Sequence, residues 1–153
     1  MSELARSFRE LRVYQLAREA NRTLFEATKL FPKDERYSLT DQIRRSGRAA
    51  KNLIPEAWAH RRYPAAFASK LTCALGEAME TQGWLDDALD YNYITKEQFA
   101  KLDADFQSIG AMLSTMIAGA ESFVPPAYRT AESPLRKTRP VPPSTIHHPP
   151  STP

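Results

Sequence analysis

The stretch from Asp41 to Tyr63, DQIRRSGRAAKNLIPEAWAHRRY, combines a helical apolar pattern with a dense set of basic residues. Together with the two residues before it, the stretch places apolar or small side chains at alternating spacings of four and three, which puts them on one face of a helix. These positions are Leu39, Ile43, Ser46, Ala50, Leu53 and Ala57. The sequence therefore predicts a helix that forms core on one face and carries positive charge on another.

Pro55 lies inside this predicted helix. Proline lacks the backbone N–H, and its ring clashes with the carbonyl four residues earlier, here that of Lys51, at a cost of about 3 kcal/mol in a regular helix interior. Because residues 56–60 continue the helical pattern, we predict a kink at Pro55 rather than a break. Ser38, with Asp41 three residues later, is the predicted N-terminal cap.

Three other segments, covering about residues 7–31, 64–89 and 95–120, repeat the four-three spacing. The segments at residues 7–31 and 95–120 open with the capping boxes Ser7–Glu10 and Thr95–Gln98, in which two side chains satisfy free backbone N–H groups reciprocally. The segment at residues 64–89, the third helix of the chain, opens with a proline, which suits the first helical turn. Its predicted core row is Phe67, Leu71, Ala74, Ala78, Thr81, Leu85 and Ala88.

The fold class follows from these four segments. No segment alternates with period two, so a sheet is not predicted. Four amphipathic helices of roughly 20–28 residues joined by short loops predict an all-α, antiparallel up-down-up-down four-helix bundle over residues 1–124. Residues 125–153 contain nine prolines among 29 residues and are predicted to form a disordered tail with polyproline II character.

Several small residues on the third helix are expected to pack inward. Gly76 and Gly83 lie seven residues apart, a spacing that favours close approach of a neighbouring helix, and Cys73 is expected to act as a small packed hydrophobe. A single cysteine forms no intrachain disulfide and favours a reducing, cytoplasmic location. The chain lacks a run of about 18 apolar residues, so neither a membrane span nor a membrane partner is predicted.

The residues of catalytic and metal sites are sparse. A di-iron bundle needs Glu-x-x-His pairs, and the sequence contains none; His60 is the only histidine of residues 1–124. The five glycines are isolated, so no phosphate-binding glycine loop is present. We therefore expect a protein without enzymatic activity, bound cofactor or metal.

The charge is segregated along the chain. The net charge is +3, and residues 1–122 are neutral overall. Within them, residues 36–62 carry seven bases against two acids, whereas residues 77–105 carry eight acids against two bases. Such asymmetry serves either an anionic partner or the pairing of helices within or between subunits.

The candidate binding residues lie in the basic stretch. Arg44, Arg48 and Lys51 follow the i, i+4, i+7 pattern of one helical ridge, and Arg45 lies one step round from it. Arg61 and Arg62 are secondary candidates. Bases in a row can neutralise the phosphates of RNA or DNA without sequence preference. The alternative is a structural assembly module, in which the ridge pairs with acids of a neighbouring subunit such as Glu77, Glu80, Asp86 or Asp87.

The chain resembles the four-helix-bundle proteins first noted as products of intervening sequences in bacterial 23S ribosomal RNA genes. The resemblance covers about residues 8–120. It is carried by Phe8–Ala17 (FRELRVYQLA), Thr28–Pro32 (TKLFP), Glu35–Arg45 (ERYSLTDQIRR), Glu56-Ala57-Trp58, Arg61-Arg62-Tyr63, Phe67–Leu71 (FASKL) and Glu77–Leu85 (EAMETQGWL).

The resemblance implies a ring-like homopentamer and no enzymatic activity. It also implies kinship with the accessory variability protein of diversity-generating retroelements, which shares this fold and binds nucleic acid and a reverse transcriptase. Two residues depart from the family pattern, because Leu53 stands where the family commonly has asparagine and Pro55 where it has alanine. The proline-rich tail also lies outside the pattern.

Overall fold

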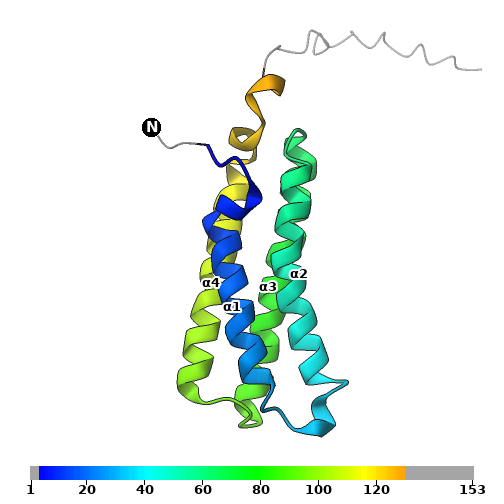
Figure 1. Cartoon of the computed structure of the whole chain (residues 1–153), viewed down its shortest axis with the longest axis vertical. Coiled ribbons are helices and arrows are strands. Elements are labelled where there is room, and N and C mark those ends of the chain that lie inside the picture. The colour runs from blue at the N-terminus through cyan, green and yellow to red at the C-terminus, as the bar shows by residue number, and fades with distance from the viewer. Residues whose placement is uncertain (1–3, 130–153) are drawn as a thin grey trace, which may run out of the picture.

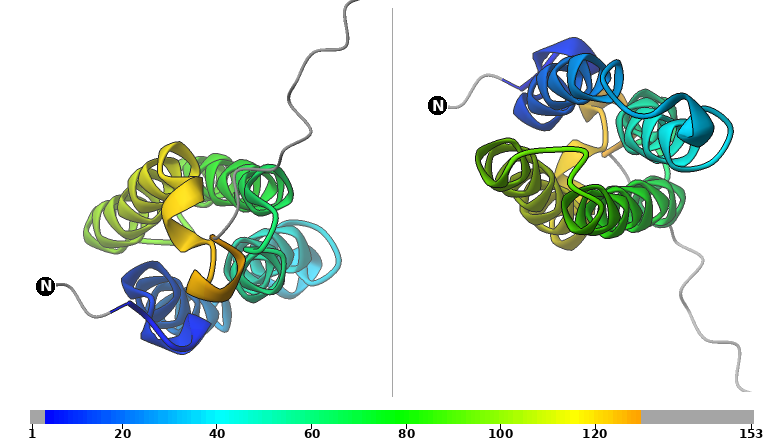
Figure 2. Two further views of the ribbon diagram at one scale, coloured as in Figure 1. Left: turned by 90° about the horizontal axis from the view of Figure 1, so that it is seen from above. Right: turned by 90° about the horizontal axis from the view of Figure 1, so that it is seen from below.

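The computed structural model describes residues 4–129, and within them the fold is a four-helix bundle. Its helices are α1 (Arg12–Thr28), α2 (Leu39–Ala59), α3 (Pro64–Asp90) and α4 (Lys96–Ala118). Successive helices run in opposite directions (Figure 1). In end view, α1 and α3 lie at opposite corners, each beside α2 and α4 (Figure 2). The predicted all-α fold is confirmed.

The core follows the predicted rows with one change of phase. Every predicted core residue of α3 is buried. On α2 the row continues through Ile54, which is 1% exposed, whereas Leu53 is only half-buried. A strict alternation of four and three assumes 3.5 residues per turn, but a straight helix has about 3.6. To stay on one face of the helix, the row of buried residues must therefore sometimes use two spacings of four in succession. On α2 the extra spacing of four is the one from Ala50 to Ile54.

The start of α1 differs from the prediction. Ser7 caps a short 3-10 helix, η1 (Phe8–Glu10), by accepting the Arg9 N–H at 3.2 Å, and α1 begins only after the extended residue Leu11. The Glu10 carboxylate accepts the Arg6 N–H at 2.8 Å instead of completing a box with Ser7. The predicted capping box at α4 is confirmed in both of its bonds.

A carboxylate, rather than the predicted Ser38, caps α2. Ser38 makes no capping bond and instead donates its hydroxyl to Glu35, the last residue of the 3-10 helix η2 (Lys33–Glu35). Glu35 also accepts the Leu39 N–H at 3.1 Å and the Tyr93 hydroxyl at 3.1 Å. These bonds, that of Ser38 foremost, lower the pKa of Glu35. A negative charge here also suits the positive end of the helix dipole.

Helices α1 and α2 approach each other closely at Gly47. A Cβ atom at this position would lie 2.7 Å from Asn21 Oδ1 and 3.0 Å from Leu24. The Asn21 amide nitrogen donates to the carbonyls of Ala17 and Gly47, both at 2.8 Å, and so links the two helices. One residue earlier, Ser46 accepts a buried hydrogen bond of 2.8 Å from Thr81 of α3.

Three small residues of α3 do not pack as predicted. A Cβ atom at Gly76 or Gly83 would meet no atom within 4 Å, and Cys73 is exposed. All three lie on the face of α3 that points away from the buried row Leu71–Ala74–Ala78. The expected close packing of a neighbouring helix is therefore wrong within one chain.

The described chain continues past the proline pair at which we expected ordered structure to end. After α4 come two 3-10 helices, η3 (Ala120–Phe123) and η4 (Pro126–Tyr128). Val124 between them is buried. The tail predicted to be disordered lies, from residue 130 on, outside the described residues. Helix α2 continues through Pro55 without a break, as expected, and the predicted kink there stays a prediction.

A pair of glycine substitutions tests the α1–α2 approach. In Gly47→Ala, the new methyl group meets an Asn21 amide held by two hydrogen bonds. Overpacking of about 1–3 kcal/mol outweighs the roughly 1 kcal/mol that alanine contributes to helix propensity, so thermal unfolding occurs at a lower temperature. The matched change Gly76→Ala meets no atom and raises the midpoint. Equal stabilisation by both would contradict the close approach.

The Glu35 cap predicts a pH-dependent effect of Glu35→Gln. A carboxyl whose pKa is lowered in the folded state stabilises the fold above its unfolded pKa of about 4.3 and loses that contribution as the pH falls through the folded value. The variant is therefore less stable than the parent at pH 7, and the two converge in acid. Denaturant unfolding at a series of pH values checks this, and a pH-independent difference would refute it.

Candidate nucleic-acid interface

A groove of about 370 Å³ runs between α1 and α2 and is lined by basic side chains from both helices. We call it the basic groove. Its lining residues are Arg18, Asn21, Arg22, Leu24 and Phe25 of α1 and Arg44, Arg48 and Lys51 of α2. Five of these eight are cationic and none is acidic. Three of the predicted binding residues thus lie together, joined by two arginines from another helix.

Helical spacing and the close helix contact build the groove. Arg18 and Arg22 are four residues apart on α1, as are Arg44 and Arg48 on α2, so each pair projects from one face of its helix. Asn21 lies between the α1 pair and fixes that helix to the Gly47 carbonyl of α2. The hydrogen bond that joins the helices therefore also sets the width of the groove.

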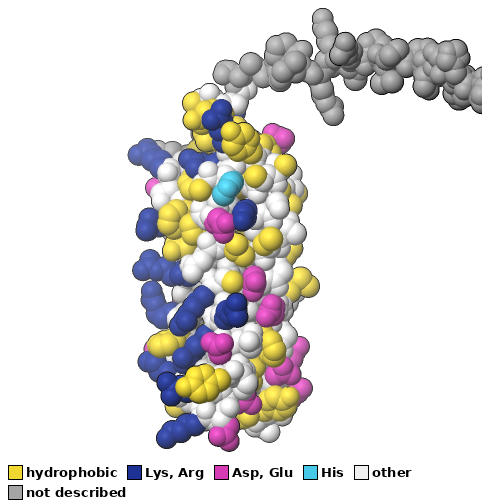
Figure 3. All heavy atoms as spheres, turned by 90° about the vertical axis from the view of Figure 1, so that its right-hand side faces the viewer, with side chains coloured by type: hydrophobic (Ala, Val, Ile, Leu, Met, Phe, Trp, Pro, Cys, Tyr) yellow, Lys and Arg dark blue, Asp and Glu magenta, His cyan; other side chains and the backbone are white. Residues whose placement is uncertain are grey.

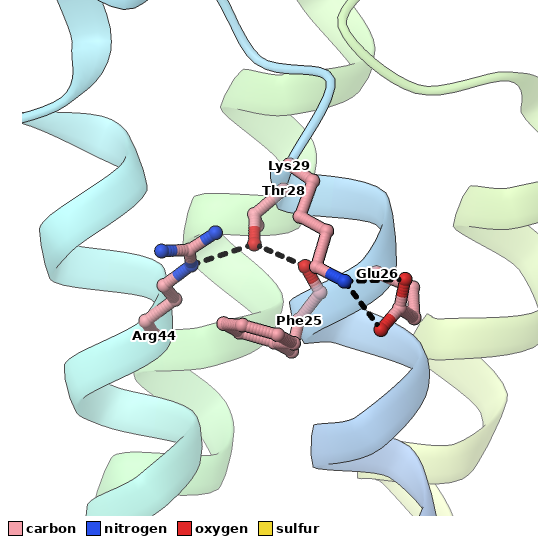
Figure 4. Close-up of polar contacts among 5 residues, drawn as sticks. All are labelled: Phe25, Glu26, Thr28, Lys29 and Arg44. Atoms are coloured by element: carbon pink, nitrogen blue, oxygen red, sulfur yellow. Dashed lines mark hydrogen bonds and ion pairs between the residues drawn. The ribbon is translucent and has the colours of Figure 1, made fainter.

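Arg44 is held at the edge of the groove by two contacts. Its Nε–H donates to Thr28 Oγ1 at 2.7 Å, and its guanidinium carbon lies 4.7 Å from the centroid of the Phe25 ring. The Thr28 hydroxyl in turn donates to the Phe25 carbonyl at 2.9 Å (Figure 4). Only one of the five guanidinium N–H groups is used in these contacts, so four remain for an anion.

No carboxylate of residues 4–129 forms an ion pair with a base of the groove. Ion pairs within residues 4–129 join Lys29 to Glu26, Lys70 to Glu56 and Lys101 to Asp105, and none of these involves a base of the groove. Figure 3 shows Lys and Arg side chains in a column along its left edge, the side on which α1 and α2 lie. Positive charge therefore gathers there without a carboxylate partner from the described chain.

The acidic surface lies on the other helices. Glu80, Asp86 and Asp90 of α3 are exposed, and Trp84 Nε1 donates to Glu80 at 3.1 Å. Within the described part of the chain, no ion pair joins this surface to the basic groove. The basic groove and the acidic surface of residues 4–129 thus do not pair with each other. Each surface remains open to a partner outside these residues.

The structure separates the other predicted binding residues from the groove. Arg45 is exposed on α2 and does not line it. Arg61 and Arg62 lie past the far end of α2, in the connection to α3. Arg61 stacks on Trp58 at 4.2 Å and donates to the Trp58 carbonyl at 2.9 Å. Arg62 lies over the rings of Tyr63 and Tyr128.

The α1 side of the groove was not predicted from the sequence. Arg18 and Arg22 share their helix with Glu19 and Glu26, so a count of charge along the chain hides them. The available signal was their spacing of four, which places them on one face. The role of Asn21 was not evident, because its partner is a backbone carbonyl 26 residues away.

Two comparisons relate the chain to known proteins. The family model described as 23S rRNA-intervening sequence protein matches residues 9–115. The chain belongs to this family. A solved structure from Bacteroides thetaiotaomicron VPI-5482, of a protein with unknown function from the S23 ribosomal protein family, has 30% identity and a TM-score of 0.63. The match covers 69% of this chain and 95% of that one.

No curated protein matches the sequence. Between residues 4 and 129, no helix is long and apolar enough to cross a membrane. The same part of the chain holds no cluster of three His, Cys, Asp or Glu side chains suited to a metal ion.

Proposed function

We propose that this member of the 23S rRNA-intervening sequence family is a binding protein whose basic groove takes the sugar–phosphate backbone of RNA or DNA. One observation carries the proposal: five cationic side chains from two helices line one groove that contains no carboxylate. Each base that neutralises a phosphate releases condensed counterions, so affinity arises without base recognition and falls as salt rises.

The dimensions of the groove suit a nucleic-acid strand. From Arg44 to Lys51 the α2 ridge rises through seven residue steps, or about 10 Å at 1.5 Å per step. One strand of a duplex places a phosphate about every 3.4 Å along the axis, so the ridge faces about three phosphates. Phe25, which is 38% exposed at the groove, adds an aromatic surface beside Arg44.

The alternative is assembly of identical chains. It is supported by the face of α3 on which Gly76 and Gly83 meet nothing, because two bare glycines allow close approach of another helix. Exposed Glu80, Asp86 and Asp90 on the same helix offer charges complementary to a basic groove of a neighbour. The family resemblance supports two further proposals, a homopentamer and a reverse transcriptase partner. The single cysteine supports a cytoplasmic location.

Removing two groove charges tests the proposal. The double variant Arg18→Ala/Arg22→Ala removes exposed side chains that make no hydrogen bond or ion pair within residues 4–129, so the fold is retained. Binding to single-stranded RNA weakens, and the slope of log affinity against log salt falls by about 0.7 for each phosphate that is no longer neutralised. Fluorescence anisotropy over a salt series measures both quantities. Arg44→Ala/Arg48→Ala is expected to give the same result.

A charge-matched control separates the groove from net charge. Arg45→Ala/Lys96→Ala also removes two exposed bases, but neither lines the groove, and binding should keep its parental slope. Equal losses of affinity in both double variants would show that only net charge matters, which refutes the groove. An unchanged slope in Arg18→Ala/Arg22→Ala, with a lower mass in light scattering, would favour assembly instead.

A further inference from the structure

A second basic pocket, of about 420 Å³, lies at one end of the bundle. The chain segments before α1 and after α4, which help to line it, are at the top of Figure 1. We call it the end pocket. Three parts of the chain meet there: the segment before α1, the end of α2 with the residue Arg61, and the segment after α4. Its charged lining residues are Arg6, Glu10, Arg12, Arg61 and Arg129. The lining therefore includes four guanidinium groups and one carboxylate.

Arg129 is fixed in this pocket by neutral acceptors. Its Nε–H donates to the Val124 carbonyl at 2.6 Å and its Nη2 to the Ser122 carbonyl at 2.7 Å. The segment that provides these carbonyls is anchored to the core, because Val124 is buried and Phe123 packs on Phe67 with ring centroids 5.0 Å apart. Three N–H groups of the guanidinium remain for an anion.

Arg61 is fixed in the same way. It lies against the Trp58 ring and donates once, to the Trp58 carbonyl, which leaves four N–H groups. Arg12 adds an exposed guanidinium at the pocket. Side chains already held in place lose little conformational entropy when a ligand arrives, and the planar guanidinium matches the oxygens of a phosphate group.

Exposed aromatic rings lie against Arg62, the sequence neighbour of the pocket residue Arg61. Arg62, the neighbour of Arg61, lies 4.2 Å from the ring of Tyr128, the neighbour of Arg129, and 5.3 Å from the ring of Tyr63. The two tyrosines are 59% (Tyr63) and 52% (Tyr128) exposed. Tyrosine rings and guanidinium planes are the surfaces on which unpaired bases stack.

We propose that the end pocket binds the phosphate of a nucleotide, with its base on the Tyr63–Arg62–Tyr128 stack. The nucleotide is either free or the phosphorylated end of a single strand. The site shares no lining residue with the basic groove, so it does not depend on the proposed function. The segment after α4 that completes it lies outside residues 9–115, the part that matches the family model.

Calorimetric titration of the full chain tests the site. Uridine 5′-monophosphate binds saturably and more tightly than inorganic phosphate, and uridine gives no heat. Because Arg12 offers charge-assisted hydrogen bonds to the phosphate, which are the strong ones, Arg12→Gln lowers affinity at least about tenfold. This variant changes an exposed side chain that makes no hydrogen bond or ion pair within residues 4–129, and its fold is checked by circular dichroism. Arg61→Gln and Arg129→Gln act in the same direction.

Controls and phosphate sources complete the experiment. Arg18→Ala/Arg22→Ala, which removes two charges from the basic groove, leaves nucleotide binding unchanged. To test the strand end as the source of the phosphate, the affinity of Arg18→Ala/Arg22→Ala for oligouridine with a 5′-phosphate is compared with its affinity for the 5′-hydroxyl form. Tighter binding of the 5′-phosphate form shows that the end pocket takes the strand end. Absence of saturable binding by the monophosphate, or equal binding in Arg12→Gln, overturns the proposal. Equal affinity for inorganic phosphate overturns the nucleotide as the ligand.

Discussion

The close contact of α1 with α2 at Gly47 is the constraint on which the charged surface depends. It brings Arg18 and Arg22 to the same groove as the α2 ridge, although like charges repel. The repulsion is tolerable because these side chains are largely exposed, where water and salt screen interactions beyond about 10 Å. Burial of the α2 row, including Ile43 and Ile54, supplies the opposing stabilisation.

The bundle therefore has two electrically different sides. Within residues 4–129, the α1–α2 side carries groove bases without carboxylate partners, and α3 and α4 carry eight of the twelve acidic residues of the four helices. A neutral sum for residues 1–122 hides this division. Within residues 4–129 the groove bases and the acids of α3 form no ion pair with each other, so each set is available to a partner outside these residues. The open face of α3 at Gly76 and Gly83 adds a second contact surface.

The fold was largely predictable from the sequence, because core positions recur with a regular period. The α3 row is buried in full, and the Thr95 capping box forms as its short motif predicts. The errors have local causes. Ile54 replaces Leu53 because a straight helix drifts from a strict heptad, and Glu35 caps α2 because a carboxylate from the preceding turn reaches the Leu39 N–H.

The candidate site was only half predictable. The spacing of Arg44, Arg48 and Lys51 identified one wall, but the other wall depends on which helix lies beside α2, and periodicity does not contain that information. The fold also places Arg61 and Arg62 away from the ridge, although they are near it in sequence. They join residues after α4 at the end of the bundle instead.

Binding of nucleic acid in the basic groove, rather than on the surface at large, can be observed residue by residue. The decisive experiment is a nuclear magnetic resonance titration of the arginine Nε–Hε signals with 5′-hydroxyl single-stranded RNA. We expect shifts for Arg18, Arg22 and Arg48, with the signal of Arg45 left in place. Uniform shifts that include Arg45, or no shift at any groove arginine, would contradict binding in the groove.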